Sequence, residues 1–290
     1  MGELRLYAVT DGGAERMVAP EQASNFADLY RYVPFGVYSA LRTFEHNKFL
    51  DLADHIARTK LSMELIGMSY HLDMQRLRRA LHQVVTLYPA GNARVRFDVL
   101  AEPATALGTD SHELIALMPF IAVPDRYYDE GVSVDYAPKL QRELARAKTS
   151  VFAQQRSQYS PGKVQDPYEF LMLDEKGHIL EGTMSNFWAV RDREVWTAGE
   201  GMLEGVTRKI ILSLLPQLDI GVRFDTVHCE DLPDLDEAAI SGSSRAVIPV
   251  VQIGGERVGD GRPGPIFRRI LGAYQEYVAG AIRTAVSGLD

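Results

Sequence analysis

Cysteine is nearly absent from this chain, since Cys229 is the only one among 290 residues. A single thiol excludes an intrachain disulfide, a CxxC pair and a cysteine-based metal cluster. The seven histidines show no His-x3-His or Cys-His spacing either, so we expect no metal site. This cysteine usage is typical of a reducing compartment, and we expect a cytoplasmic protein.

Long apolar runs are also missing. The strongest run, residues 114–123, is interrupted by Pro119. It is shorter than the roughly 20 residues that a helix needs to cross a bilayer. The first residues lack the apolar stretch of a secretory signal. We therefore interpret 114–123 as a buried strand and expect no membrane partner.

Basic residues are in the minority, because 31 lysines and arginines stand against 39 aspartates and glutamates and leave a net charge of −8. A dedicated nucleic-acid binder normally carries a basic face that neutralises phosphates, so we expect no nucleic-acid partner. With 46% hydrophobic residues, the chain can bury the cores of two domains of about 100–150 residues each.

The order of apolar patterns predicts an α/β protein of the α+β type with two domains. We expect a small N-terminal α+β domain at 1–123, a linker at 124–130, where the composition is typical of a loop, and a larger α/β domain at 131–290. In the smaller domain, strands flank two helices, expected at 51–67 with Asp51 or Asp54 as the N-cap, and at 72–87. The second helix carries an apolar stripe of Leu77, Leu81, Val84 and Tyr88.

The larger domain alternates short strand-like pieces with turn residues, which predicts a mixed sheet or a barrel. We expect strands at 169–174, 178–182, 187–190 and 194–197. We expect 142–159 to be helical or partly helical and to end at Ser160-Pro161-Gly162. We expect further helices at 206–215, stopped by Pro216, and from Pro265 onward.

Lysine is scarce, with seven residues against 24 arginines among the 31 basic side chains. A lysine that forms a Schiff base must lose its proton near neutral pH and face a carbonyl group. Lys148 is flanked by small and apolar residues, whereas Lys176 lies in an Asp-Glu-Lys-Gly turn. Lys148 is therefore the better candidate for a catalytic lysine, and a solvated helix lysine is the alternative.

Residues 170–187 contain an apolar strand, then Asp-x-x-Gly, then Glu-Gly-x-x-Ser-Asn-Phe. This pattern resembles the fold type IV pyridoxal-phosphate enzymes, which include branched-chain aminotransferases, D-amino-acid transaminases and aminodeoxychorismate lyases. The resemblance extends from about residue 36 to residue 264. In that family the Schiff-base lysine lies a similar distance before the glutamate of the Glu-Gly motif, and Lys148 precedes Glu181 by 33 positions.

The resemblance implies pyridoxal 5′-phosphate as the cofactor, in a cleft between the two domains, and a homodimer. It makes Lys148 the catalytic, cofactor-binding lysine and Glu181 the partner of the pyridine nitrogen. The cofactor withdraws electrons only while that nitrogen holds a proton, which an adjacent carboxylate stabilises.

Three further segments resemble the phosphate-binding elements of the family. Gly205-Val206-Thr207 begins a helix, where unpaired amides favour an anion, although Glu204 replaces the proline of the family's Pro-Gly-Ile-Thr-Arg. The segment 54–58, Asp-His-Ile-Ala-Arg, resembles Glu-His-Leu-x-Arg and implies that Arg58 binds the phosphate. The Ser-rich turn implies a hydroxyl from Ser243 and an amide from Ser244.

The sequence leaves several candidates for the substrate-binding residues. Arg42, Arg96 or Arg245 could bind a carboxylate, and Phe35 and Tyr38 could line the side-chain pocket. Salt bridges are the alternative for the arginines. Two positions depart from the aminotransferase pattern: Ser39 replaces an acidic residue, and Ala153 replaces a tyrosine of many branched-chain enzymes.

We therefore predict an aminotransferase that moves an amino group between an amino acid or amine and a 2-keto acid, with a branched-chain amino acid, a D-amino acid or an (R)-amine as the donor. An aminodeoxychorismate lyase that releases pyruvate and 4-aminobenzoate is the alternative, which Ser39 favours. A non-catalytic module that binds pyridoxal phosphate is the alternative of another class. The expected partners are the small-molecule amino donor and the keto acid.

Overall fold

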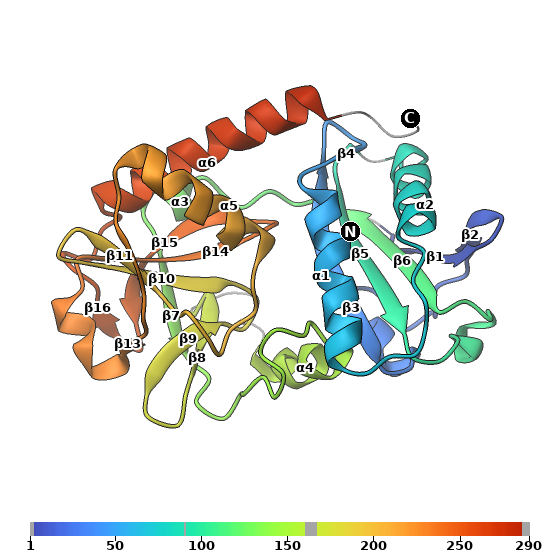
Figure 1. Ribbon diagram of the computed structural model, residues 1–290, viewed down its shortest axis with the longest axis horizontal. Helices are drawn as coiled ribbons and strands as arrows, with labels where there is room; N and C mark the ends of the chain where they lie inside the picture. Colours follow the sequence, from blue (N-terminus) through green and yellow to red (C-terminus); the bar gives the residue numbers. More distant parts are fainter. Residues whose placement is uncertain (1–2, 90, 160–166, 286–290) are drawn as a thin grey trace. The chain divides into compact units, whose positions relative to one another are not determined.

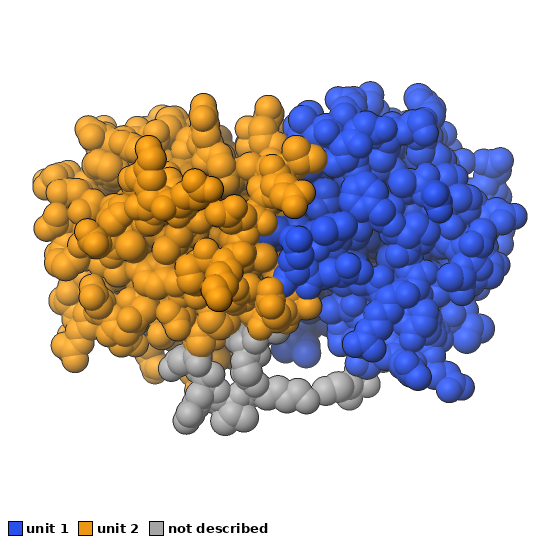
Figure 2. All heavy atoms as spheres, turned by 90° about the horizontal axis from the view of Figure 1, so that it is seen from below, with its two compact units in different colours: residues 1–121, 147–155, 278–290 blue, residues 122–146, 156–277 orange. Residues whose placement is uncertain are grey.

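The computed structural model describes residues 3–89, 91–159 and 167–285 (Figure 1). The chain forms two compact units, which Figure 2 shows in different colours. Unit 1 comprises Met1–Ile121, Ala147–Gln155 and Val278–Asp290, and unit 2 comprises Ala122–Arg146 and Arg156–Tyr277. The expected division assigned every residue from 131 onward to one domain, whereas unit 1 also includes 147–155 and 278–290.

Unit 1 contains one six-stranded sheet in which every neighbouring pair is antiparallel. In sheet order the strands are β2 (Gly13–Met17), β1 (Arg5–Thr10), β6 (Glu113–Pro119), β5 (Ala93–Leu100), β3 (Gly36–Phe44) and β4 (Lys48–Phe49). The buried strand predicted at 114–123 is present as β6 but ends at Pro119, and Ile121 beyond it is exposed.

Both faces of this sheet are buried at β6, which explains the unbroken apolar run at 114–119. Ile115 and Leu117 pack in the core under the helices, while Leu114 and Ala116 pack in a second core on the opposite face. The helices are α1 (Leu52–Leu65) and α2 (Met74–Thr86). The predicted stripe of α2 is buried as expected.

Asp51, one of the two predicted N-cap residues, occupies the N-cap position of α1, but its side chain makes no capping hydrogen bond. Its backbone lies in the left-handed region, with φ 45°. In α2 the N-cap residue does act through its side chain: the Asp73 carboxylate accepts hydrogen bonds from the amides of Gln75 and Arg76.

Unit 2 contains a closed barrel, as the mixed-sheet or barrel prediction expected. Pairing runs through β10 (Asn186–Arg191), β14 (Glu237–Gly242), β15 (Ala246–Ile253), β7 (Val132–Tyr136), β8 (Glu169–Leu173) and β9 (His178–Gly182), and returns to β10. β7 is parallel to both of its neighbours, and the other pairs in this circuit are antiparallel. The circuit closes where Glu181 of β9 lies opposite Asn186 of β10.

Further strands extend this sheet: β11 (Glu194–Thr197), β12 (Val222–Phe224), β13 (Val227–His228) and β16 (Glu256–Arg257). The predicted helix at 206–215 is α5 (Val206–Leu214), which continues as a 3-10 turn at Leu215–Leu218 that includes Pro216. The last helix is α6 (Pro265–Thr284).

The segment 142–159 is helical only in its second half. α4 covers Ser150–Gln155 and a 3-10 turn covers Arg156–Tyr159, whereas the residues before Ser150 form a loop. Ser160-Pro161-Gly162 lies outside the described residues. Among the described helices, none has the length and apolar character needed to span a bilayer.

Candidate active site

Lys148 lies in unit 1, in the loop that leads into α4, and its backbone is fixed on both sides. Its carbonyl oxygen accepts a hydrogen bond from the Tyr38 amide at 3.0 Å. Its amide donates to the Ser62 hydroxyl at 3.1 Å. The half-buried side chain places Nζ 4.9 Å from the centre of the Tyr38 ring. Two residues predicted for the site, Lys148 and Tyr38, are thus in contact.

Arg58 belongs to the same environment. Its Nη2 donates to the Ser39 hydroxyl at 2.9 Å, and that hydroxyl is 2.9 Å from Nδ1 of His55. Ser39 and His55 are both buried. Burial, together with the nearby charges of Arg58 and Lys148, holds the pKa of His55 well below its usual range. The histidine therefore stays neutral beside the two cations.

Glu181 lies in unit 2, at the point where β9 closes the barrel. Its Oε1 accepts from Nε of Arg142 at 2.9 Å, and its Oε2 accepts from the Leu203 amide at 3.2 Å. The two charged side chains are 3% and 4% exposed, so each compensates the buried charge of the other. Sequence reasoning missed Arg142, because it lies in an irregular loop with no motif that links it to Glu181.

The loop that Glu181 binds leads directly into α5. Asn186, opposite Glu181 in the barrel, donates from Nδ2 to the Leu203 carbonyl at 2.7 Å. At Gly205 a Cβ would overlap Oδ1 of Asn186, so a larger residue would require the Asn186 side chain to move. Glu181 and the start of α5 are thereby attached to one short loop.

The start of α5 has the properties of an anion site. Gly205 is its N-cap and has no side chain that could cap the helix. The amides of Val206 and Thr207 have no acceptor within the helix, and the helix dipole places positive potential there. Thr207 is 3% exposed. These donors match the requirements of a phosphate group.

Ser243 and Ser244 form the turn between β14 and β15, and α5 packs against β14. Arg245, in the same turn, forms an ion pair with the fully buried Glu169. Glu169 also accepts from the Met184 amide at 2.6 Å and from the Ser185 hydroxyl at 3.0 Å. Arg245, a predicted substrate residue, therefore also connects this turn to the turn between β9 and β10.

The other predicted substrate arginines lie on neighbouring strands of unit 1. Arg96 is 2% exposed, pairs with Asp98, and places its guanidinium 4.3 Å from the centre of the Tyr38 ring. Arg42 stacks 4.0 Å from the ring of Phe44 and 3.9 Å from that of Phe120. Tyr38 thus contacts both Arg96 and Lys148. Phe35, the further candidate for the pocket wall, is 44% exposed.

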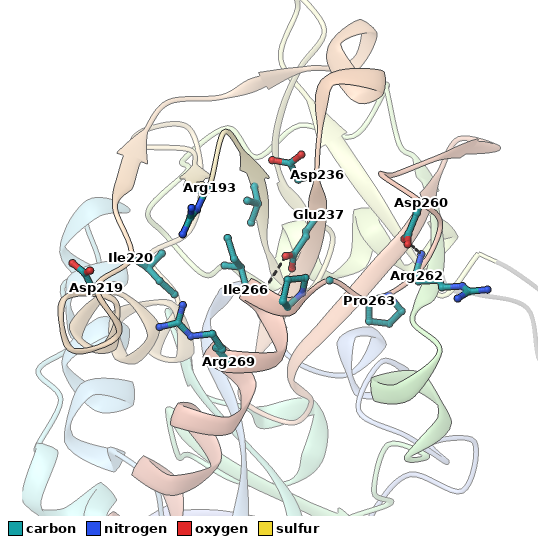
Figure 3. A pocket seen from close by; sticks show the side chains of 13 residues that line it. Arg193, Asp219, Ile220, Asp236, Glu237, Asp260, Arg262, Pro263, Ile266 and Arg269 are labelled. Atoms are coloured by element: carbon teal, nitrogen blue, oxygen red, sulfur yellow. Dashed lines mark hydrogen bonds between the residues drawn. The ribbon is translucent and has the colours of Figure 1, made fainter.

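Unit 2 also has a pocket of about 680 Å³ that none of the predicted site residues lines (Figure 3). Figure 3 shows Glu237 at its wall, turned toward the start of α6. The carboxylate of Glu237 accepts from the amides of Ile266 and Phe267 at 2.8 and 2.9 Å. An acidic side chain therefore already occupies this helix start. The pocket lies at the opposite end of β14 from Ser243.

The model of the family "Amino-transferase class IV" matches residues 36–253. A D-alanine aminotransferase of Staphylococcus aureus (strain COL) is 23% identical over 258 residues, which cover 84% of this chain and 88% of that protein. A probable branched-chain-amino-acid aminotransferase of Thermotoga maritima is 23% identical over 270 residues, which cover 90% and 92%.

Solved structures agree on the fold. A branched-chain aminotransferase of Thermoproteus uzoniensis, solved with norvaline, superposes with a TM-score of 0.77 at 22% identity, over 97% of this chain and 96% of that one. The chain belongs to the class IV aminotransferases and is a transaminase. The family resemblance and the fold prediction are confirmed.

Proposed function

We propose that this transaminase uses Lys148, Glu181 and the start of α5 to hold pyridoxal 5′-phosphate, the cofactor of its family. The observation that carries the proposal is the loop at Leu203, which binds the Glu181 carboxylate and then leads into the uncapped start of α5. The two groups at this loop suit the two ends of pyridoxal phosphate. The carboxylate would face the protonated ring nitrogen, and the helix start would face the phosphate.

The donor set fits a phosphate dianion. Gly205, Val206 and Thr207 supply backbone amides and a hydroxyl at a helix start. We assign Arg58 as the guanidinium that binds the phosphate, and Ser243 and Ser244 as a further hydroxyl and amide.

When bound, the cofactor accepts electrons from the substrate α-carbon. Lys148 Nζ would hold the cofactor aldehyde and would act as the general base and acid that moves a proton at the substrate α-carbon. Glu181 stabilises the proton on the ring nitrogen, and Arg142 fixes the Glu181 carboxylate. Tyr38 borders the lysine. Arg42, Arg96 and Arg245 are the candidates for binding the substrate carboxylate.

We propose amino acids of the D-alanine or branched-chain type as donors, with (R)-amines as the third class, and a 2-keto acid as the acceptor. The relatives named D-alanine and branched-chain-amino-acid aminotransferases support the first two classes. A homodimer is proposed from the family resemblance, and a cytoplasmic location from the cysteine usage.

The lyase alternative loses the feature that favoured it. The Ser39 hydroxyl is fully buried and is bonded to Arg58 and His55, so it does not offer a proton to a substrate. The non-catalytic alternative conflicts with the chain's place among the aminotransferases.

The test is an amino-donor panel. The purified protein, loaded with pyridoxal phosphate and supplied with 2-oxoglutarate, is assayed with D-alanine, L-leucine and an (R)-amine, with the glutamate product quantified by chromatography. We expect transfer from at least one donor. Formation of pyruvate and 4-aminobenzoate from aminodeoxychorismate, without any transfer in the panel, would reverse the choice in favour of the lyase.

A further inference from the structure

The guanidinium of Arg58 contacts a hydrogen-bonded pair of uncharged side chains. Arg58 lies on α1, Ser39 on β3 and His55 one turn before Arg58 on the same helix. The distances from Nη2 to the Ser39 hydroxyl and from that hydroxyl to His55 Nδ1 are both 2.9 Å. Ser39 is 0% exposed and His55 is 1% exposed.

A guanidinium has only donors, so Arg58 donates and the Ser39 oxygen accepts. The direction of the second hydrogen bond depends on the tautomer of His55, because a hydroxyl oxygen can accept two hydrogen bonds. We assign the tautomer in which Nε2 carries the hydrogen and Nδ1 accepts, since the serine hydrogen then also has a partner. The lowered pKa of His55 agrees with a neutral ring.

We propose that Ser39 and His55 are positioning residues that orient the Arg58 guanidinium for the phosphate of the cofactor. This inference rests on the proposed role of Arg58 in phosphate binding. The Ser39 bond fixes the direction of Nη2 without adding a negative charge that would compete with the phosphate. His55 fixes the serine rotamer, because a hydroxyl that donates to Nδ1 turns its lone pairs toward Arg58.

The test separates the phosphate from the aldehyde by the choice of ligand. The apoprotein is titrated by fluorescence with 4′-deoxypyridoxine 5′-phosphate, which has the phosphate but no aldehyde, and with pyridoxal, which has the aldehyde but no phosphate. We expect Ser39→Ala to weaken binding of the first ligand roughly 10- to 100-fold, the range for a hydrogen bond to a charged group. Binding of pyridoxal should change less than about 2-fold, since it lacks the group that Arg58 binds.

Matched variants control for packing. Thr59→Ala removes a hydroxyl that is also buried on α1 but bonds to the His55 carbonyl, and we expect no ligand-specific loss. His55→Asn retains an acceptor near the Nδ1 position and should bind both ligands like the wild type. His55→Leu removes the acceptor and should resemble Ser39→Ala.

A double-mutant cycle gives the decisive comparison. Because Ser39 acts through Arg58, its removal should have no further effect on phosphate-ligand binding in an Arg58→Met background. Equal losses for both ligands, or additive effects in the cycle, would overturn the positioning role. Failure of the wild-type protein to bind pyridoxal phosphate at all would overturn the proposed function itself, which is a different result.

Discussion

Nε of Arg142 lies 2.9 Å from Oε1 of Glu181, and both side chains are almost fully buried. A buried ion pair keeps each charge compensated, and it fixes the orientation of the carboxylate. The second carboxylate oxygen is bonded to the loop before α5. The group that we assign to the cofactor nitrogen is therefore held from two directions.

Replacement of Glu181 by Gln should retain the cofactor but lower kcat about 100-fold, because a neutral amide stabilises a pyridinium proton poorly. The free energy of unfolding should fall by about 1–3 kcal/mol, since the charge of Arg142 loses its buried counterion. Steady-state kinetics and urea titration measure the two effects. Glu175→Gln, in the exposed turn of the same hairpin, is the control, and an unchanged kcat in Glu181→Gln would contradict the assignment.

Replacement of Lys148 by Ala should abolish turnover and the covalent attachment of the cofactor. Borohydride treatment of the loaded wild type, followed by peptide mass spectrometry, should find the pyridoxyl group on Lys148. Lys176→Ala removes an exposed lysine and should leave both results intact. Label on another lysine, or full activity in Lys148→Ala, would remove Lys148 from the mechanism.

Thr207→Ala should weaken binding of pyridoxal phosphate roughly 10-fold through the loss of one charge-assisted hydrogen bond, and Thr207→Ser should restore it. Equilibrium dialysis measures the affinity. Ser213→Ala, further along α5 with a hydroxyl bonded to the Ile210 carbonyl, controls for loss of a helix hydroxyl. Equal affinities of Thr207→Ala and the wild type would exclude this hydroxyl from the phosphate site.

The buried His55 should make the apoprotein less stable in acid. Its pKa in the folded protein is lowered by burial and by Arg58 and Lys148, so below pH about 6.5 the unfolded chain binds a proton that the folded chain does not. The free energy of unfolding should fall with decreasing pH, by up to about 1.4 kcal/mol per pH unit, until the folded-state pKa is reached.

This pH effect is isolated by comparing the wild type with His55→Asn in chemical unfolding at a series of pH values from about 7.5 down to about 5. The difference in stability should shrink in acid, because the variant has no such proton to bind. His71→Asn, at an exposed position, is the control. A difference that is constant across this pH range would show that His55 titrates alike in both states.

The sequence predicted the elements with strong periodicity well. The apolar stripe of α2 and the short strands of the barrel follow from local patterns, because their burial repeats along the chain. The barrel closure at Glu181 and Asn186 could not be predicted in this way, because it depends on a pairing between strands that no local pattern indicates. The segment from residue 142, expected to be helical or partly so, is helical only from Ser150 onward. Its first half is a loop in which Arg142 forms an ion pair with Glu181.

The candidate site was predictable where a residue belongs to a continuous motif, as with Glu181, Thr207 and Arg58. The partners that orient these residues were not. Arg142, Glu169 and His55 act through contacts with residues far away in the sequence or through burial, and their side chains alone are ordinary. Their roles can be recognised only from the three-dimensional structure.

Hydrogen bonds on both sides of Lys148 fix the position of its backbone. With its carbonyl bonded to Tyr38 and its amide to Ser62, the main chain is tethered to a strand and a helix, and four methylene groups link it to the amine. The amine that we propose as the catalytic group can therefore change its position through side-chain rotamers, without any rearrangement of the backbone that carries it.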